Sequence, residues 1–256
     1  MKPNYLLMLM FFLFYASVKA QGVPQRKARF PVGLYTTGDS DIYGLSFGIG
    51  SDTYIDSDTV SVRSYGIRIE PISQSLLFFT LIFPVDRVRY PQTPTEIREF
   101  EKKIPNEVIN GINISCGTNA FADVNGITLS AFVQSLRQTN GLSVAGFSNY
   151  SFRNNGMQVA VCMSGSVKSN GVVAALFGTE INTGRGLQIS AFGNDYNTFS
   201  GVQIGMLNGA YGKAEKFTGV QIGLFNNAKK LRGIQIGLIN KNEKRILPFI
   251  NWNFKD

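Results

Sequence analysis

The stretch that decides the fold is Gly-Val-Gln-Ile-Gly-Leu-Phe-Asn at residues 219–226. Near copies flank it, Gly-Val-Gln-Ile-Gly-Met-Leu-Asn from Gly201 and Gly-Ile-Gln-Ile-Gly-Leu-Ile-Asn from Gly233. Upstream the pattern softens but keeps its phase, with opening glycines at residues 186, 171, 156, 141, 126 and 111. All six spacings from Gly111 to Gly201 are 15 residues, and the next two are 18 and 14. Such regularity indicates a tandem repeat.

Apolar and polar residues alternate within each copy. The first and third positions after the glycine are apolar in all nine copies, the second is mostly polar, and the fourth is Ser, Ala or Gly. An alternation of period two is typical of a strand with one buried face. We therefore predict an apolar inner face and an outer face that carries the glutamines Gln188, Gln203, Gln221 and Gln235. The glutamine row is interpreted mainly as an amide ladder that holds register.

A single short strand cannot bury its apolar face, so the copies must stack on one another. We predict an all-β fold in which tandem 15-residue repeats form a parallel β-solenoid, with the glycines at tight corners. With coils about 4.8 Å apart, nine copies would make a rod roughly 43 Å long. The alternative is one antiparallel hairpin per repeat. Membrane-spanning strands fit worst, because two of them need more residues than one period supplies.

The chain divides into four segments. Residues 1–20 are predicted to be a signal peptide, because Lys2 precedes an 11-residue apolar run and small residues lead to a cleavage site after Ala20. Residues 21–110 are predicted to be an N-terminal β region, with degenerate repeats, an insertion and a helix. The β-repeat array covers residues 111–246, and a capping strand covers residues 247–256.

Both ends of the array are expected to be covered. Fainter copies at Gly44 and Gly66 suggest that the array begins near residue 44 and is interrupted by a longer insertion. Thr93-Pro94-Thr95-Glu96 predicts the start of a short capping helix near 94–104. We expect this helix to lie against or plug the upstream end, with a lid over a site as the alternative. At the other end, alternating Ile250, Trp252 and Phe254 predict a closing strand.

Positive charge is concentrated at the C-terminal end. The formal net charge of +8 falls to +6 without the predicted leader, residues 21–200 are neutral, and residues 201–256 carry nine basic and three acidic side chains. Such a region suits anionic envelope glycans, lipid headgroups or another envelope protein. A solubilising rim is the alternative, and nucleic acid is not expected for a secreted chain. The possible interaction surface comprises Gln188, Gln203, Gln221, Gln235, Lys213, Lys216, Lys229, Lys230 and Arg232.

The sequence offers little for catalysis. It contains no histidine, which removes the commonest general base and metal ligand. The carboxylates of the array, interpreted as lying in turns with no two adjacent in one column, are Asp123, Glu180, Asp195, Glu215 and Glu243. We predict no catalytic residue, no cofactor and no metal site. Cys116 and Cys162 lie three repeats apart, so we expect both to be free and mostly buried.

The repeats at residues 201, 219 and 233, together with the ending Leu-Pro-Phe-Ile-Asn-Trp at 247–252, resemble a family of secreted bacterial surface-repeat proteins. These are known mainly from Bacteroidetes-like and spirochaete-like Gram-negative bacteria. The resemblance covers residues 111–254 well and 44–110 more loosely. It implies a cell-surface, periplasmic or outer-membrane location, and it supplies no catalytic residues. Some members look like lipoproteins, but this chain lacks the lipid-bearing cysteine.

From these observations we expect an exported, non-enzymatic repeat protein that acts as a structural or binding module at the cell envelope. The first alternative is an outer-membrane-associated β protein whose strands lie partly in lipid. The second is a carbohydrate-active β-solenoid enzyme, since paired carboxylates on such a fold can cleave glycans.

Overall fold

The computed structural model describes residues 26–50, 59–73, 90–91, 93–209 and 214–254. The predicted signal peptide and Lys213 lie outside these residues. The first elements are β1 (Lys27–Arg29), β2 (Val32–Leu34), the 3-10 helix η1 (Tyr35–Thr37), β3 (Ser40–Ile49), β4 (Val62–Ile72) and α3 (Pro94–Lys102). The regular repeats form β5 (Glu107–Ser115), β6 (Asn119–Ser130), β7 (Val133–Ala145), β8 (Ser148–Ala160), β9 (Met163–Ala175), β10 (Gly178–Ser190) and β11 (Gly193–Ile204). The last elements are β12 (Leu207–Asn208), β13 (Lys216–Ile222), β14 (Phe225–Ala228), β15 (Lys230–Asn242) and β16 (Ile246–Asn253).

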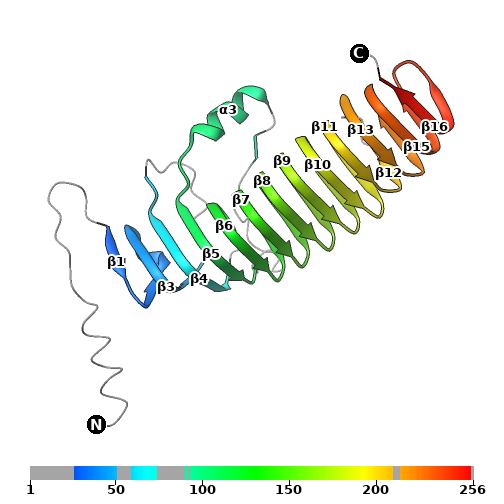
Figure 1. Ribbon diagram of the computed structural model, residues 1–256. Coiled ribbons are helices and arrows are strands. Elements are labelled where there is room, and N and C mark those ends of the chain that lie inside the picture. The colour runs from blue at the N-terminus through cyan, green and yellow to red at the C-terminus, as the bar shows by residue number, and fades with distance from the viewer. Residues whose placement is uncertain (1–25, 51–58, 74–89, 92, 210–213, 255–256) are drawn as a thin grey trace, which may run out of the picture.

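The strands stack into a parallel β-solenoid of about 12 turns, which confirms the predicted fold class. Figure 1 shows the coils in chain order along one axis, from β3 to β15. Neighbouring strands pair in parallel, and the antiparallel hairpin alternative is therefore wrong. The spacing of 18 residues between Gly201 and Gly219 does not disturb the register, because these two glycines still face each other.

The repeat glycines form one column from Gly44 to Gly233. Gly66 pairs directly with Gly111, so the chain leaves the solenoid after β4 and rejoins it in phase at β5, as the faint upstream copies predicted. Each glycine from Gly44 onward has a positive φ; at Gly219 it is 129°. A Cβ atom on Gly219 would lie 2.0 Å from the carbonyl oxygen of Gly201. The corner therefore requires glycine for its backbone angle and for the close approach of the coil below.

The predicted direction of the strand faces is wrong. Gln188, Gln203, Gln221 and Gln235 are fully buried, and large apolar residues at the neighbouring positions face outward. Ile222, for example, is 40% exposed although it follows Gln221 directly. The alternation is real, but its polar side points into the solenoid because each buried amide finds a partner in the next coil.

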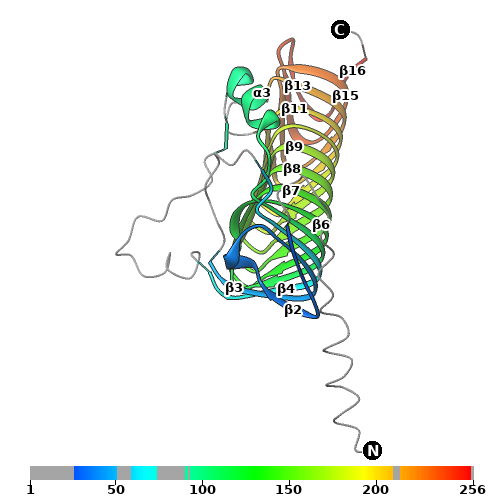
Figure 2. The same ribbon diagram turned by 90° about the vertical axis from the view of Figure 1, so that its left-hand side faces the viewer.

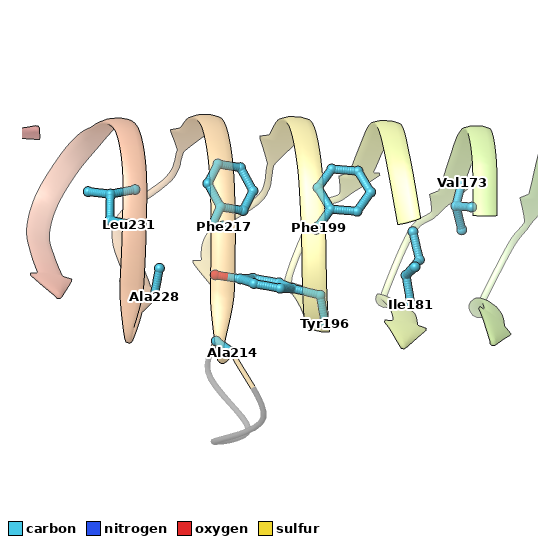
Figure 3. Packing of buried hydrophobic residues seen from close by; sticks show 8 residues of the cluster. All are labelled: Val173, Ile181, Tyr196, Phe199, Ala214, Phe217, Ala228 and Leu231. Carbon is cyan, nitrogen blue, oxygen red and sulfur yellow. The ribbon is translucent and has the colours of Figure 1, made fainter. Parts of the chain in front are cut away.

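Hydrophobic packing fills the part of the interior next to the glutamines in the late coils. Figure 3 shows Phe199 and Phe217 side by side from successive coils, with Tyr196 lying across the interior below them. The two phenylalanine rings are stacked with centroids 6.0 Å apart. The Tyr196 hydroxyl donates to the carbonyl of Asn227 at 2.8 Å. Aromatic rings and amides therefore share the same interior, one stack beside the other.

Helix α3 begins with the predicted capping box, in which the Thr93 side chain accepts from the Glu96 backbone amide and Glu96 accepts from the Thr93 amide. Its predicted place at the upstream end is wrong. Figure 2 shows it beside the stacked coils. Phe100 packs on Phe121, Phe152 and Val167 from β6, β8 and β9. The helix lies along the flank because these side chains offer it an apolar surface there.

The two ends of the solenoid are covered by other elements. At the upstream end, η1 places Tyr35 over the Arg68 guanidinium, 4.0 Å from the ring centroid. At the downstream end, β16 turns back and pairs antiparallel with β15, which confirms the predicted closing strand. Asn251 of β16 occupies the interior next to Gln235, while Trp252 faces outward opposite Ile234. The reversal of direction ends the stack of parallel coils.

Candidate functional site

One side of the solenoid carries an unbroken row of outward apolar side chains. It comprises the first, third, fifth and sixth positions after each repeat glycine from Gly111 to Gly233, and we call it the apolar face. The first and third positions lie on one flat strand, and the fifth and sixth lie at the next corner of the coil. Because the register is kept from coil to coil, each position forms a continuous column along the axis.

No charged residue occurs in the six positions that follow any of these nine glycines. Large side chains are well exposed there: Leu176 at 51%, Phe192 at 50% and Leu238 at 54%. Phe177 and Phe192 stack outside with nearly parallel rings, 5.5 Å between centroids. With coils about 4.8 Å apart and residues about 3.3 Å apart, the face covers roughly 800 Å². Ordinary exposed apolar patches on monomers are smaller than this.

The interior is polar along its length. We call the residues at the second position after each glycine the axial column. Its members are Ser46, Arg68, Asn113, Thr128, Ser143, Gln158, Val173, Gln188, Gln203, Gln221 and Gln235, and Asn251 of β16 extends it. None is more than 1% exposed. Val173 is the one apolar member, so the interior is held mainly by hydrogen bonds.

In the late coils the axial column is a chain of amides that all point the same way. Gln203 donates to Gln188 at 2.8 Å, Gln221 to Gln203 at 2.6 Å, and Gln235 to Gln221 at 2.7 Å. Asn251 then donates to Gln235, and its own oxygen accepts from Nε of Arg245 at 3.0 Å. The ladder predicted from the sequence exists, but it lies inside, where no binding partner can reach it.

A second amide ladder supports the corner below the apolar face. Asn194, Asn208, Asn226 and Asn240 are linked in series by hydrogen bonds of 2.7–2.8 Å. Asn208 also donates to the carbonyl of Ile222, and Asn226 donates to the carbonyl of Ile236. These bonds satisfy backbone carbonyls where the strand bends and the sheet hydrogen bonds end. The ladder therefore lets apolar side chains on both sides of the bend point outward.

A row of basic residues borders the apolar face on its glycine side. Arg185 and Arg232 immediately precede repeat glycines, and Lys216 and Lys230 lie three positions before them. We call these four exposed residues the basic rim. Lys216 and Lys230 face each other in adjacent coils, an unfavourable pairing of like charges. Within the described part of the chain no carboxylate pairs with Lys216, Lys230 or Arg232.

The other predicted surface residues are placed less favourably. Lys229 is exposed, but it pairs with Glu215 of the preceding coil. The four glutamines are inside, so the predicted interaction surface is corrected to its basic members and the apolar face beside them. Arg153 and Lys168, which continue the column of Lys216 upstream, are both paired with Glu101 of α3 at 2.5 and 2.6 Å. The unpaired basic residues are thus those near the C-terminal end, as the charge distribution indicated.

The early coils contain a buried cluster of charges. The Arg68 guanidinium pairs with Glu107 at 2.7 Å and with Glu70 at 3.1 Å, and it donates to Asn113 at 2.9 Å. Burial acts to lower the pKa of Arg68, but the two carboxylates hold it above its ordinary value. Burial likewise raises the pKa of Tyr35. The carboxylates are occupied by their arginine, so this cluster is built for stability rather than for catalysis.

The distribution of the carboxylates needs one correction. Glu180 and Asp195, read from the sequence as unpaired, are direct neighbours in register on β10 and β11. Glu180 lines a small cleft beside α3 together with Tyr90, Tyr150 and Ser166. Burial, and then the charge of Glu180, raises the pKa of Tyr150. Asp123 pairs with Arg137 at 2.7 Å, although burial raises its pKa.

The cysteines and the search for other sites agree with a binding role. Cys116 and Cys162 are free as predicted, but both are partly exposed rather than buried, because they occupy fifth and sixth positions on the apolar face. Among the residues with described positions, no group of acidic or cysteine side chains could hold a metal ion. In the same residues, no helix has the length and apolar character needed to cross a membrane.

The sequence analysis missed the apolar face because it assigned apolar residues to the interior. Two signals could have revealed it. Consecutive apolar residues at the fifth and sixth positions, such as Leu224 and Phe225, cannot both point inward on a strand. The small residue at the fourth position also indicates a narrow interior, which has no room for four large apolar columns in each coil.

No protein-family model matches this chain, and neither a curated protein nor a solved structure matches it.

Proposed function

We propose that this chain is an exported, non-enzymatic structural or binding module of the cell envelope of a Gram-negative bacterium. The apolar face is its proposed binding surface. The observation that carries the proposal is the placement of polar residues inside and uncharged apolar residues outside over nine consecutive coils. A solenoid that served only as a rigid spacer would gain nothing from such a face. Large exposed apolar patches mark surfaces that are covered by a partner.

The experiment follows the chain in a Gram-negative host that produces it with its predicted leader. We expect the N-terminus of the purified product to be Gln21 and the protein to co-sediment with the envelope. The double variant Leu176→Thr/Leu238→Thr should release it, because it removes two exposed members of the apolar face without touching the interior. Ile104→Thr, which changes an exposed residue beyond α3, is the matched control and should stay in the envelope.

Two results would contradict the proposal. Retention of Met1 in a cytoplasmic product would exclude export. Equal sedimentation of the face variant and the unaltered chain would exclude the apolar face as the binding surface. Release of the unaltered chain by salt or high pH without detergent would separate peripheral attachment from the alternative of strands lying partly in lipid.

A carbohydrate-active enzyme is the second candidate, favoured by the register of Glu180 and Asp195 beside the cleft. Glycan cleavage by paired carboxylates requires two such groups on opposite sides of the bond. The measurement is turnover of a panel of acidic and neutral polysaccharides by the unaltered chain and by Glu180→Gln. Turnover that is lost in Glu180→Gln would replace the binding-module proposal.

A further inference from the structure

We propose that the apolar face lies on the surface of an anionic lipid bilayer, with the solenoid axis parallel to the membrane and the basic rim at the headgroups. This inference rests on the proposed function, since it names the occupant of the same face. A lipid surface, a second copy of the chain and another envelope protein could each cover apolar side chains. The charges around the face favour the lipid.

The form of the apolar face suits a membrane interface. Peripheral proteins bind a bilayer through an apolar side of large area, placed within the headgroup and acyl boundary, next to basic residues. The apolar face provides aliphatic and aromatic side chains along the whole array and no charge within it. The flank of the solenoid that bears α3 carries Arg153, Lys168 and Glu101, and these charges would be excluded from lipid. The molecule therefore lies on the membrane on one side and does not sink into it.

The basic rim supplies the electrostatic part of the attraction. Arg185, Lys216, Lys230 and Arg232 lie at the edge of the apolar face, and the last three have no carboxylate partner among the described residues. Two of them, Lys216 and Lys230, repel each other unless an anion lies nearby. Anionic headgroups attract each basic residue near the surface by about 1 kcal/mol, which is roughly a fivefold gain in affinity.

The same charges argue against a second copy of the chain. Two copies that joined their apolar faces with axes aligned would bring one basic rim against the other. The net charge of residues 201–256 is positive, nine basic against three acidic side chains, so the late coils would repel. A pair with opposed axes would avoid this contact but would leave the basic rims of both copies without anionic partners.

The final strand provides an aromatic anchor and a built-in reporter. Trp252 lies opposite Ile234 and extends the apolar face past the last coil, with half of its surface exposed. The Arg245 guanidinium lies 5.1 Å from its ring centroid. Tryptophan is enriched where proteins meet the headgroup region, because its ring has an apolar body and a polar edge. It is also the one tryptophan of the sequence, so its emission reports on this face alone.

The test adds the purified chain to protein-free vesicles of equimolar phosphatidylglycerol and phosphatidylcholine, and to vesicles of phosphatidylcholine alone. We expect the chain to float with the anionic vesicles. We also expect Trp252 emission to shift to shorter wavelength and to be quenched by lipids brominated near the headgroup end of their acyl chains. The affinity for neutral vesicles should be lower by at least tenfold.

Two pairs of variants separate the apolar and the electrostatic contributions. Leu176→Thr/Leu238→Thr should lower the affinity for both kinds of vesicle by at least tenfold, because two apolar side chains no longer enter the interface. Arg185→Gln/Arg232→Gln should lower the affinity for anionic vesicles about 25-fold and leave that for neutral vesicles unchanged. Arg98→Gln/Lys102→Gln loses the same charge from exposed positions on α3 and should bind like the unaltered chain.

The outcomes are distinct. Absence of flotation and of any Trp252 shift would overturn the lipid proposal. If the envelope retention described above still depended on Leu176 and Leu238, the binding module would survive with a protein as its partner. A concentration-dependent dimer in size-exclusion chromatography that the face variant abolishes would instead identify a second copy as the occupant. Equal loss of binding in the Arg98/Lys102 control would reduce the basic rim to a general effect of net charge.

Discussion

The early and the late coils fill the same interior column with different chemistry. In the early coils, Arg68 holds two carboxylates and an asparagine from neighbouring strands. In the late coils, Gln203, Gln221 and Gln235 repeat one amide contact from coil to coil. The first arrangement depends on unlike groups that meet once, and the second on identical groups that meet at every turn. A charge cluster is thus tied to one place in the chain, whereas an amide ladder can be extended by adding repeats.

The largest effect is expected from Arg68→Met. This change leaves Glu70 and Glu107 buried without their counter-charge, which typically costs about 3–5 kcal/mol of stability. The midpoint of urea unfolding, followed by circular dichroism, should fall accordingly. The triple variant Arg68→Met/Glu70→Gln/Glu107→Gln removes the buried charge altogether and should recover a large part of the loss. An unchanged midpoint in the single variant would show that the cluster contributes no stability.

The next effect is expected at the corner that both regions share. Gly219→Ala forces a side chain into a positive φ and against the Gly201 carbonyl, and we expect a cost on the order of 3 kcal/mol. Gly38→Ala is the control, since Gly38 also has a positive φ but no atom lies within 4 Å of its added Cβ. Equal loss in both variants, measured by thermal unfolding, would assign the whole effect to backbone angle rather than to the close approach of coils.

A smaller effect is expected from Gln221→Leu in the ladder. It leaves the oxygen of Gln203 and the amide of Gln235 without their partner, and an unsatisfied buried polar group costs about 1–3 kcal/mol. Gln138→Leu, at a partly exposed position bonded to Asn140, provides a matched control and should cost less than about 1 kcal/mol. If both changes had the same effect on thermal unfolding, the ladder would be no stronger than an ordinary surface contact.

The smallest effect concerns the contact between α3 and the flank. The hydrogen bond from Lys168, with the charges of Lys168 and Arg153, holds the pKa of Glu101 below its ordinary value. A lowered carboxyl pKa stabilises the docked helix above the pKa of the unfolded state, and this contribution disappears as the pH falls through the folded-state pKa. We expect at most about 1 kcal/mol, seen as faster proteolysis around residues 94–104 on acidification. Glu101→Gln should cleave faster at neutral pH and lose this dependence on pH.

Much of the fold could be read from the sequence because its period is exact in length. The glycine spacing determined the parallel register, including the return of the chain from Gly66 to Gly111. The Thr93 capping box determined where α3 begins. The direction of the strand faces could not be read, because alternation of period two is the same whichever side points inward. The site was missed for that reason.

The position of α3 was also beyond the sequence pattern. Its apolar residue Phe100 required a surface, and the surface consists of Phe121, Phe152 and Val167 from three different coils. These residues come together only when the solenoid is assembled. The register of Glu180 with Asp195 is different: their spacing of 15 residues equals the period, so it could have been read from the sequence.

The sequence by itself determined the repeat, the glycine corner, the alternation within each strand and the accumulation of positive charge in the last coils. Only the tertiary structure decided that glutamine lies inside and that isoleucine, leucine and phenylalanine lie outside. The reason is that a buried amide is costly when alone and tolerated when an identical amide lies one coil away. Stacking supplies that partner, and the apolar residues are thereby left on the surface, where we propose that they bind.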